Sequence, residues 1–447
     1  METMLKRLLS LAVALVMVIG LMPWNVASVY ATEEVPGETE APEEEGFTCT
    51  NPNHDHTDET VTWTAWNGTG NLTGPGHYYL EIDGDSVNRS GGLTVKNDVV
   101  IDLNGKTINI TGASFRIYYG EDNTVLTIQN GAFTYKAGVT YTQDGAFASM
   151  GKAGAELYVN GMTVDGNGVI SNKGNGGLIH SNKTDNIVAI KDSTFKNFAT
   201  TGYGGAINLY GGQAALENVN FENCAAANGG AIAVRNSGTM TLTNCNFTGC
   251  ISTYELTGDE NADVNKGGGA LLVGGGANVT MNGGVITGST ASCGEGVAVR
   301  VDGNSTFNLA GGEITENKAS NAKSAVYIAE GSTFNMTGGT ISNNTYLGDT
   351  TYRYEITIDG NATISGGKIY GGKETGSEKY NRTLFAAESA DVTIEEGAAI
   401  YGIMYGEAAS ALKITGGEFW KAYTQKSVKG SSDSIFKKIS FANSEGL

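Results

Sequence analysis

Two arginines in the middle of the chain are the basic residues whose spacing in the sequence could support acid–base chemistry. Arg235 and Arg300 end equivalent apolar segments two repeats apart, and Asp302 follows Arg300 by two residues. A polysaccharide lyase requires a basic residue that removes a proton and a cluster of aspartates that binds calcium. A glycoside hydrolase instead requires two carboxylates that flank the bond to be broken.

The residues around these arginines do not complete either kind of active site. The intervening segment has Gly274 at the matching place, and the sequence contains no Asp-Asp pair and no Asn-Thr-Asp or Gly-His-Gly motif. We therefore predict that Arg235 and Arg300 are surface residues and that the chain has no catalytic residue. Several acidic and basic side chains converging on one face over three neighbouring repeats would indicate an enzyme, and we expect no such convergence.

Metal chemistry also has little support in the sequence. The four histidines are His54, His56, His77 and His180. Cys49, His54 and His56 are close enough in sequence to bind one metal ion together, but structural zinc sites usually have four ligands and no fourth is evident. A polar stretch without a metal is the favoured interpretation, and we predict no metal and no cofactor.

The five cysteines are too few and too scattered for a disulfide framework. Cys224 and Cys250 belong to adjacent repeats. Each lies eight residues after the second apolar residue of its repeat, which is Leu216 for Cys224 and Leu242 for Cys250. Stacked repeats would bring their Cα atoms to about 5 Å, which is within the range for a disulfide. A bridge between Cys224 and Cys250 and a pair of buried free thiols are both consistent with this spacing.

An insertion at 346–354 concentrates aromatic side chains. Exposed tyrosine and arginine side chains can stack on sugar rings or bind a protein partner. The candidate residues for binding a glycan or a partner are Tyr346, Tyr352, Arg353 and Tyr354. The alternative is a loop that only covers an edge of the fold.

All these residues depend on an internal repeat for their positions. Each copy has an apolar-x-apolar pattern, then two or three turn residues, then a further apolar residue. The second apolar residues of the twelve copies, which we name anchors, are Leu103, Ile128, Val159, Ile190, Leu216, Leu242, Met281, Leu309, Met336, Ile364, Ile394 and Ile414. The first and last anchors are 311 residues apart over eleven intervals, so the period is about 28 residues.

The repeat predicts the fold class. Alternation with a period of two is typical of β-strands, and the Asn-Gly and Gly-Gly pairs supply turns. Strands this short cannot bury an apolar face alone, but stacking copy on copy buries all of them. We predict an all-β protein, a right-handed parallel β-helix (solenoid) of about 12 coils with three short strands per coil. The right hand follows from the general handedness of parallel crossovers.

Equivalent residues of successive coils should stack in ladders. The anchors should line the interior, and Phe195, Phe221 and Phe247 should stack in consecutive coils. Four asparagines recur shortly after this aromatic position, and we interpret them as turn residues with unusual backbone angles that can hydrogen-bond along the stack. These asparagines are Asn197, Asn223, Asn317 and Asn344.

Composition divides the chain into segments. All five prolines lie in the first 75 residues, and the acidic stretch before the repeats is rich in glutamate. The N-terminus has a basic start and an apolar run of signal-peptide length. The expected segments are a signal peptide at 1–31, an acidic disordered linker at 32–60, an N-terminal cap at 61–100, the parallel β-helix at 101–420 and a C-terminal cap or tail at 421–447.

The repeats resemble those of known exported proteins. FKNFATTGYGGAI at 195–207 and FENCAAANGGAI at 221–232 resemble the repeat of the chlamydial polymorphic membrane proteins. The later repeats are similar to those of exported bacterial surface proteins with a pectin-lyase-like right-handed β-helix. The resemblance covers about residues 100–420 and implies the β-helix fold and display at a surface. It also raises the hypothesis of an enzyme that acts on polysaccharides.

These observations favour a secreted bacterial surface β-helix protein with a non-catalytic role in adhesion or cell-surface structure. The alternative is a carbohydrate-active enzyme, either a polysaccharide lyase or a glycoside hydrolase, or a glycan-binding module. The expected partners are surface glycans or proteins of a host or of bacteria. The net charge of −19 argues against nucleic acid, and no apolar stretch of membrane length follows the signal peptide. The expected location is extracellular, with possible association with the cell surface.

Overall fold

The structure is a computed structural model of the 447-residue chain. It describes residues 47–54, 61–172, 175–253, 267–292, 295–319, 324–346, 354–371, 382–408 and 411–420. The expected signal peptide, the C-terminal tail and most of the acidic linker lie outside these ranges. The chain divides into two units, Met1–Trp63 and Thr64–Leu447. No helix of the described residues is long and apolar enough to cross a membrane.

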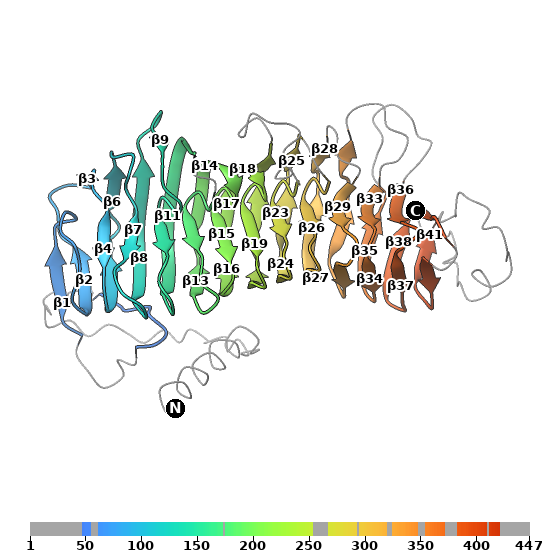
Figure 1. Ribbon diagram of the computed structural model, residues 1–447, viewed down its shortest axis with the longest axis horizontal. Coiled ribbons are helices and arrows are strands. Elements are labelled where there is room, and N and C mark those ends of the chain that lie inside the picture. Colours follow the sequence, from blue (N-terminus) through green and yellow to red (C-terminus); the bar gives the residue numbers. More distant parts are fainter. Residues whose placement is uncertain are drawn as a thin grey trace, which may run out of the picture. The chain divides into compact units, whose positions relative to one another are not determined.

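Parallel strands stacked coil on coil build the second unit (Figure 1). Each of the central and C-terminal coils contributes one strand to a narrow sheet and the remaining strand segments to a broad sheet. Strands of neighbouring coils pair in parallel, as β15 does with β12 and β19. This arrangement confirms the predicted all-β parallel β-helix. The narrow sheet consists of β4 (Leu93–Val95), β7 (Ile117–Tyr119), β10 (Ala148–Met150), β12 (Ile179–Ser181), β15 (Ile207–Tyr210), β19 (Ile232–Arg235), β23 (Leu271–Val273), β26 (Val299–Val301), β29 (Ser324–Ile328), β33 (Tyr354–Ile358), β36 (Arg382–Ala386) and β39 (Ile403–Gly406).

The broad sheet contains the remaining described strands, some of which run through a corner of the coil without interruption. It consists of β1 (Trp63–Trp66), β2 (Gly76–Leu80), β3 (Ser86–Arg89), β5 (Asp98–Asp102), β6 (Thr107–Ile110), β8 (Val125–Tyr135), β9 (Thr140–Tyr141), β11 (Glu156–Ser171), β13 (Ile187–Lys191), β14 (Thr194–Tyr203), β16 (Gln213–Glu217), β17 (Asn220–Glu222), β18 (Ala225–Asn228), β20 (Thr239–Thr243), β21 (Asn246–Thr248), β22 (Ile251–Ser252), β24 (Asn278–Thr287), β25 (Thr290–Ala291), β27 (Thr306–Thr315), β28 (Lys318–Ala319), β30 (Thr333–Met336), β31 (Thr340–Ser342), β32 (Thr345–Tyr346), β34 (Asn361–Ile364), β35 (Gly367–Tyr370), β37 (Asp391–Ile394), β38 (Ala398–Tyr401), β40 (Leu412–Ile414) and β41 (Glu418–Trp420).

The anchors form one continuous ladder in the core. Ile128 pairs with Val159, and the register continues through every later anchor to Ile414. The anchors are buried, apart from Ile414, which is partly buried. The first anchor was assigned to the wrong residue, because Ile101 pairs with Ile128 and Leu103 lies two residues beyond it. Residues two apart in a strand face the same side, so the apolar pattern alone does not separate Ile101 from Leu103.

The aromatic ladder is also confirmed. Phe195, Phe221 and Phe247 pair in register, with ring centroids 5.9 Å and 4.9 Å apart and nearly parallel planes. Ile286 takes the equivalent position in the next coil. The ladder fills the interior with side chains that repeat at the spacing of the strands, which is the stacking that a short strand needs to bury its apolar face.

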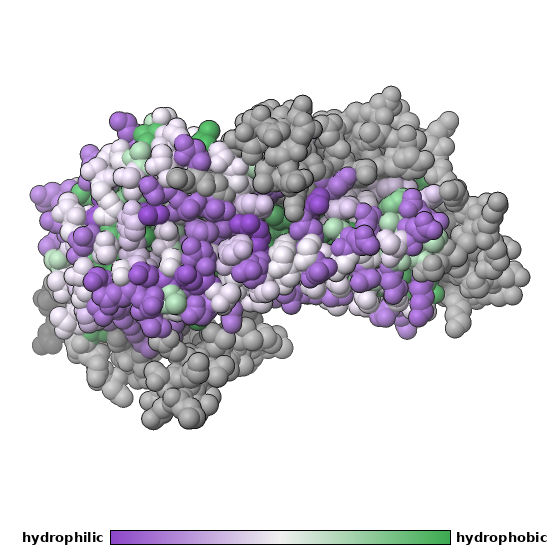
Figure 2. Space-filling view, in the orientation of Figure 1, coloured by the Kyte–Doolittle hydropathy of each residue, from purple (hydrophilic) through white to green (hydrophobic). Residues whose placement is uncertain are grey.

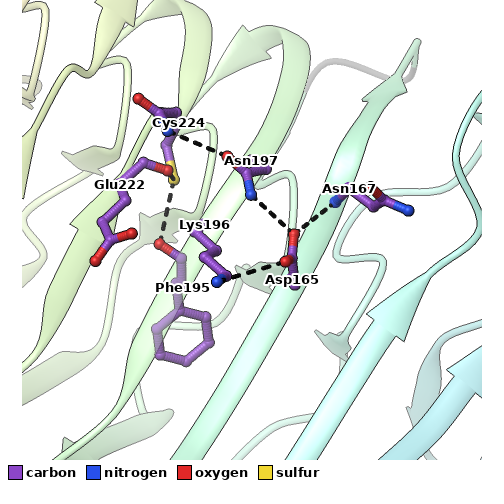
Figure 3. Close-up of polar contacts among 8 residues, drawn as sticks. Asp165, Asn167, Phe195, Lys196, Asn197, Glu222 and Cys224 are labelled. Atoms are coloured by element: carbon purple, nitrogen blue, oxygen red, sulfur yellow. Dashed lines mark hydrogen bonds and ion pairs between the residues drawn. The ribbon is translucent and has the colours of Figure 1, made fainter.

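Asn197 and Asn223 occupy a corner of the coil, as predicted, and form a ladder there. Figure 3 shows Asn197 beside Asp165 of the preceding coil. Both asparagines have positive φ angles, 57° and 52°. Asn223 Nδ2 donates to Asn197 Oδ1 at 3.2 Å, and Asn197 Nδ2 donates to Asp165 Oδ1 at 3.0 Å. Asn tolerates this backbone region better than most residues, so the same side chain relieves strain and links coils.

Asn317 and Asn344 also form a ladder, but of a different kind. Both side chains are buried, and the positive φ angles belong to the preceding residues, Glu316 and Asn343. Asn317 Nδ2 donates to Asn344 Oδ1 at 2.9 Å, and Asn344 Nδ2 donates to the carboxylate of Glu355. The expectation of hydrogen bonds along the stack is confirmed for these two residues, while the expectation of unusual backbone angles is wrong for them.

The parallel ladder extends to the N-terminal side of residue 101. β2 pairs with β5, and β3 pairs with β6, both in parallel. The segment expected to cap the helix therefore contributes strands to it. The face shown in Figure 2 is mainly hydrophilic, with hydrophobic residues in small separate patches, which is expected when the apolar ladders face inward.

Candidate functional site

Alternate residues of the narrow sheet face away from the core and form columns along the helix. In β26, Val299 and Val301 are fully buried in the core, so Arg300 between them faces outward. Parallel register aligns Arg300 with Tyr327 of β29. The outward column consists of Thr94, Tyr118, Ser149, His180, Asn208, Ala233, Leu272, Arg300, Tyr327, Thr357, Phe385 and Tyr405.

The register corrects the relationship expected between the two arginines. β19, β23 and β26 align Arg235 with Gly274 and Asp302, by continuation of the paired residues that precede them. Arg300 is aligned with Leu272 and therefore lies in the neighbouring column. The expectation that Arg235 and Arg300 are equivalent is wrong, because Asp302 occupies the position that Arg235 has two coils earlier.

The first group of polar side chains on this face surrounds Arg235. Arg235 Nε donates to Asn208 Oδ1 and Nη2 donates to Asn175 Oδ1, both at 3.2 Å. The guanidinium carbon lies 3.5 Å from the ring centroid of Tyr203 and 5.1 Å from that of Tyr210. Tyr210 remains 41% exposed. We name these residues, with His180, the Arg235 cluster: Asn175, His180, Tyr203, Asn208, Tyr210 and Arg235.

The hydrogen bonds of Asn208 define the state of His180. Arginine only donates, so Asn208 Oδ1 must face Arg235 and its Nδ2 must face His180 Nδ1, at 2.9 Å. His180 Nδ1 is therefore an acceptor, and the neutral ring carries its proton on Nε2. Burial lowers the pKa of His180, and the charges of Arg235 and Arg116 lower it further, against opposing effects that include Asp144.

Arg235 lies on the outward face of the sheet, as predicted for a surface residue, but it is only partly exposed. Its side chain is half-buried between aromatic rings, and burial lowers its pKa. The two hydrogen bonds and the contact with Tyr203 together hold the guanidinium in one orientation. The result is a positive charge that is held in place beside an exposed tyrosine ring.

A second group of polar side chains lies further along the same face. Arg300 Nε donates to Asp302 Oδ2 at 3.1 Å, and the guanidinium carbon of Arg300 is 5.0 Å from the Tyr327 ring centroid. Tyr327 Oη donates to Asp359 Oδ2 at 2.6 Å. Burial and this hydrogen bond raise the pKa of Tyr327. We name Arg300, Asp302, Tyr327 and Asp359 the Arg300 cluster.

The Arg300 cluster contradicts the expectation that acidic and basic side chains would not converge. Its four residues come from three neighbouring coils, those of β26, β29 and β33. Arg300 also faces outward, as predicted for a surface residue, but only 15% of its side chain is exposed. Asp302 and Asp359 share one column with Ala329 between them, so their Cα atoms are separated by two strand spacings, about 10 Å. Two carboxylates thus flank a small residue on this face.

Gly274 leaves room for one of these carboxylates. A Cβ atom on Gly274 would lie 2.7 Å from Asp302 Oδ1, so the Asp302 side chain extends over the preceding coil, along the column that it shares with Arg235. Leu272, the outward residue of that coil, is 1% exposed. The coil of β23 therefore separates the two clusters with an apolar side chain and a glycine.

The expected binding residues of the insertion lie largely outside the described part of the chain. Tyr352 and Arg353 are not described, and for Tyr346 only the backbone of β32 is. Tyr354 begins β33, where its side chain is 2% exposed and its ring centroid lies 5.3 Å from that of Phe385. Their binding role stays a prediction, although a ring as buried as that of Tyr354 offers little surface to a sugar.

Cys224 and Cys250 lie in adjacent coils and are free thiols in the structure. Both are fully buried, and each donates to backbone oxygens, as Cys224 Sγ does to Phe195 O at 3.6 Å (Figure 3). Burial raises the pKa of both thiols, to about 12 for Cys250. Of the two arrangements consistent with the sequence, the structure contains the pair of buried thiols.

Two residues of the metal-binding motif considered in the sequence belong to the first unit and are described. Cys49 Sγ lies 3.4 Å from His54 Nδ1, and Asn51 Nδ2 lies 3.2 Å from His54 Nε2. Both ring nitrogens of His54 therefore have a neighbouring side chain. His56 lies outside the described residues.

Sequence reasoning missed several members of the two clusters, chiefly His180, Asn208, Tyr203 and Asp359. Each joins its cluster only because successive coils stack, as for Asn208 and Arg235, which are 27 positions apart, and for Tyr327 and Asp359, which are 32 positions apart. The available signal was the alternation within strands: a polar residue between two apolar residues, such as Asn208 in INLY, faces outward. This signal identifies outward positions, but the register between coils is also needed to say which of them are neighbours.

The fold and this face define a parallel β-helix that carries a row of arginine, tyrosine, amide and carboxylate side chains. No protein-family model, no curated protein and no solved structure matches the chain. The residues of the two clusters are therefore the basis for proposing a function.

Proposed function

We propose that this protein is a secreted bacterial β-helix protein that binds glycans at a surface without cleaving them. In this proposal the fold belongs to the pectin-lyase-like right-handed group, and the repeats are of the type found in chlamydial polymorphic membrane proteins. The ligand is a polysaccharide of a host or bacterial surface, and the narrow sheet is the face that binds it.

The observation that supports this proposal is the position of Arg235 between Tyr203 and Tyr210. Tyrosine rings present a flat apolar face that packs on a sugar and a hydroxyl group that hydrogen-bonds with it. Arg235 is already restrained by Asn208 and Asn175, so it loses little conformational freedom when a ligand binds. Tyr210 is exposed, which makes its ring accessible.

The test is a panel of acidic and neutral polysaccharides incubated with the purified protein, with retention and new chain ends both measured. We expect retention of at least one polysaccharide and no new chain ends. Tyr210→Ala should abolish retention, while Tyr210→Phe, which keeps the ring, should preserve most of it. Retention that is unchanged in Tyr210→Ala would show that the ligand binds elsewhere.

A second candidate function, glycoside hydrolysis, is favoured by the separation of Asp302 and Asp359. In inverting enzymes the two carboxyl groups are about 6.5–9.5 Å apart, which leaves room for a water molecule. The Cα atoms of Asp302 and Asp359 are two strand spacings apart, about 10 Å, which is just above that range. New chain ends that disappear in both Asp302→Asn and Asp359→Asn, but persist in Tyr210→Ala, would favour this function over simple binding.

A further inference from the structure

We propose that the N-terminal coils contain a second binding site, a pocket around Arg89 that takes a small oxyanion such as a carboxylate or a phosphate group. The pocket lies in the second unit, beside the turn that follows β3, and has a volume of about 400 Å³. The residues that matter for the argument are Thr69, Gly70, Asn71, Asn88, Arg89 and Ser90. This proposal rests on the N-terminal coils alone and is independent of the glycan-binding face.

Arg89 is a buried cation without a counter-ion. It is the last residue of β3, faces the interior alongside Val87, and is 5% exposed. Its guanidinium donates to four backbone carbonyl groups, those of Gly68, Gly70, Gly91 and Gly92. Within the described residues it forms no ion pair. Carbonyl dipoles satisfy hydrogen bonds but leave the net charge uncompensated, which is costly in a buried position.

The hydrogen-bonding capacity of Arg89 is also incomplete. A guanidinium has five N–H groups, and the four carbonyl groups account for four of them. The second N–H of Nη2 has no acceptor among the residues that the structure describes. An oxyanion in the pocket would supply both this acceptor and the missing negative charge.

The indole of Trp66 provides a second unsatisfied donor, next to a residue that lines the pocket. Trp66 is 6% exposed, and its Nε1 is buried with no hydrogen-bond partner in the described part of the chain. This nitrogen lies 3.9 Å from the position that a Cβ atom on Gly70 would take, and Gly70 lines the pocket. A tryptophan N–H only donates, so its natural partner is an acceptor. The guanidinium carbon of Arg89 is 5.8 Å from the same indole ring.

The other lining side chains complete an environment for an anion. Asn71 Oδ1 accepts a hydrogen bond from the backbone N–H of Thr94. The Nδ2 group of Asn71, which is a donor, therefore faces away from Thr94. Asn88 and Ser90 are hydrophilic and exposed at the pocket, and no carboxylate lines it. In a chain with a net charge of −19, a pocket with a buried cation and no acidic side chain is selective for negative charge.

The test is titration of the full-length protein by calorimetry at constant ionic strength with inorganic phosphate, with glucuronate and with glucose. We expect saturable binding of one site by at least one of the two anions and none by glucose. Tighter binding of phosphate would identify a phosphate group as the occupant, and tighter binding of glucuronate would identify the carboxylate of an acidic sugar. Absence of saturable binding by both anions would overturn the proposal.

Single substitutions distinguish anion binding in the pocket from a general attraction of anions to positive charge on the protein. Arg89→Gln should weaken anion binding at least tenfold, while Lys96→Gln, which removes a more exposed cation near the same end, should change it less than twofold. Equal effects of the two substitutions would overturn the proposal. If Arg89→Gln does not fold, the variants Gly70→Ala and Asn88→Ala test the proposal instead. Neither substitution removes a contact that holds the coil together. Both should weaken binding several-fold without lowering Tm.

Discussion

The guanidinium carbon of Arg235 lies 3.5 Å from the ring centroid of Tyr203, a residue of a different coil. This contact places a positive charge against an aromatic ring and fixes the plane of the guanidinium. Asn208 and Asn175 hold the same group from other directions. The arrangement is one that lysine cannot reproduce, because an ammonium group has neither the planar fork nor the reach to both amides.

The first prediction concerns the substitution Arg235→Lys. We expect glycan affinity to fall about tenfold, because the hydrogen bonds to Asn208 and Asn175 cannot both form. Stability should fall by about 1 kcal/mol, the typical net contribution of such a hydrogen bond. Calorimetric titration measures the affinity and thermal unfolding measures the stability. An affinity equal to that of the unsubstituted protein would show that Arg235 only supports the fold.

The second prediction concerns the loss of stability as the pH rises from 4.5 to about 8. Burial raises the pKa of Glu355 from its ordinary value of 4.5 to about 8. The folded state therefore holds the proton more tightly than the unfolded state. Stability from this group is fully present below pH 4.5 and is lost as the pH rises to about 8.

Glu355→Gln tests this prediction, because a neutral amide keeps the shape of the protonated acid. Between these pH values the free energy of unfolding of the unsubstituted protein should decline on the order of a few kcal/mol relative to the variant. Denaturant titrations at several pH values measure the difference. Parallel pH profiles for the two proteins would contradict the burial of an uncharged Glu355.

The third prediction concerns acid pH and His180. Burial lowers its pKa from 6.5, so the unfolded state binds the proton more readily than the folded state. Stability from this group is present above pH 6.5 and is lost as the pH falls through that value toward the folded pKa. Protonation also places a hydrogen on Nδ1, which ends its role as acceptor for Asn208. His180→Gln should remove this part of the acid sensitivity, and thermal unfolding between pH 7 and pH 5 measures it.

The fourth prediction concerns the buried thiols. Cys224 and Cys250 should resist alkylation in the native protein, because burial both shields them and raises their pKa. In denaturant without reductant, both should react, and mass spectrometry locates the label. Failure to react until a reductant is added would show that the two residues form a disulfide in the isolated protein.

The fifth prediction concerns the corner ladder. Asn223 has a positive φ of 52° and donates to Asn197. Asn223→Ala should lower the free energy of unfolding by about 1–2 kcal/mol, since alanine is disfavoured in that backbone region and the hydrogen bond is lost. Asn223→Gly is the matched control, because it loses the bond but accepts the backbone angle, and it should cost less. Equal losses would assign the whole effect to the hydrogen bond.

The repeat pattern by itself determined the fold class, the core ladder from Ile128 to Ile414 and the stacking of Phe195, Phe221 and Phe247. These follow from local physics: alternation marks strands, and strands with apolar faces must stack to bury them. The period of about 28 residues then brings equivalent residues together without further information.

The composition of the site depended on the register between coils. Arg300 and Arg235 each end an apolar segment, yet the structure aligns Asp302 with Arg235. A strand has a side-chain period of two, so a shift of two residues leaves the apolar pattern unchanged while it replaces every outward neighbour. Packing of one coil on the next selects among these shifts, and only the folded chain reveals the contacts of His180, Asn208 and Asp359.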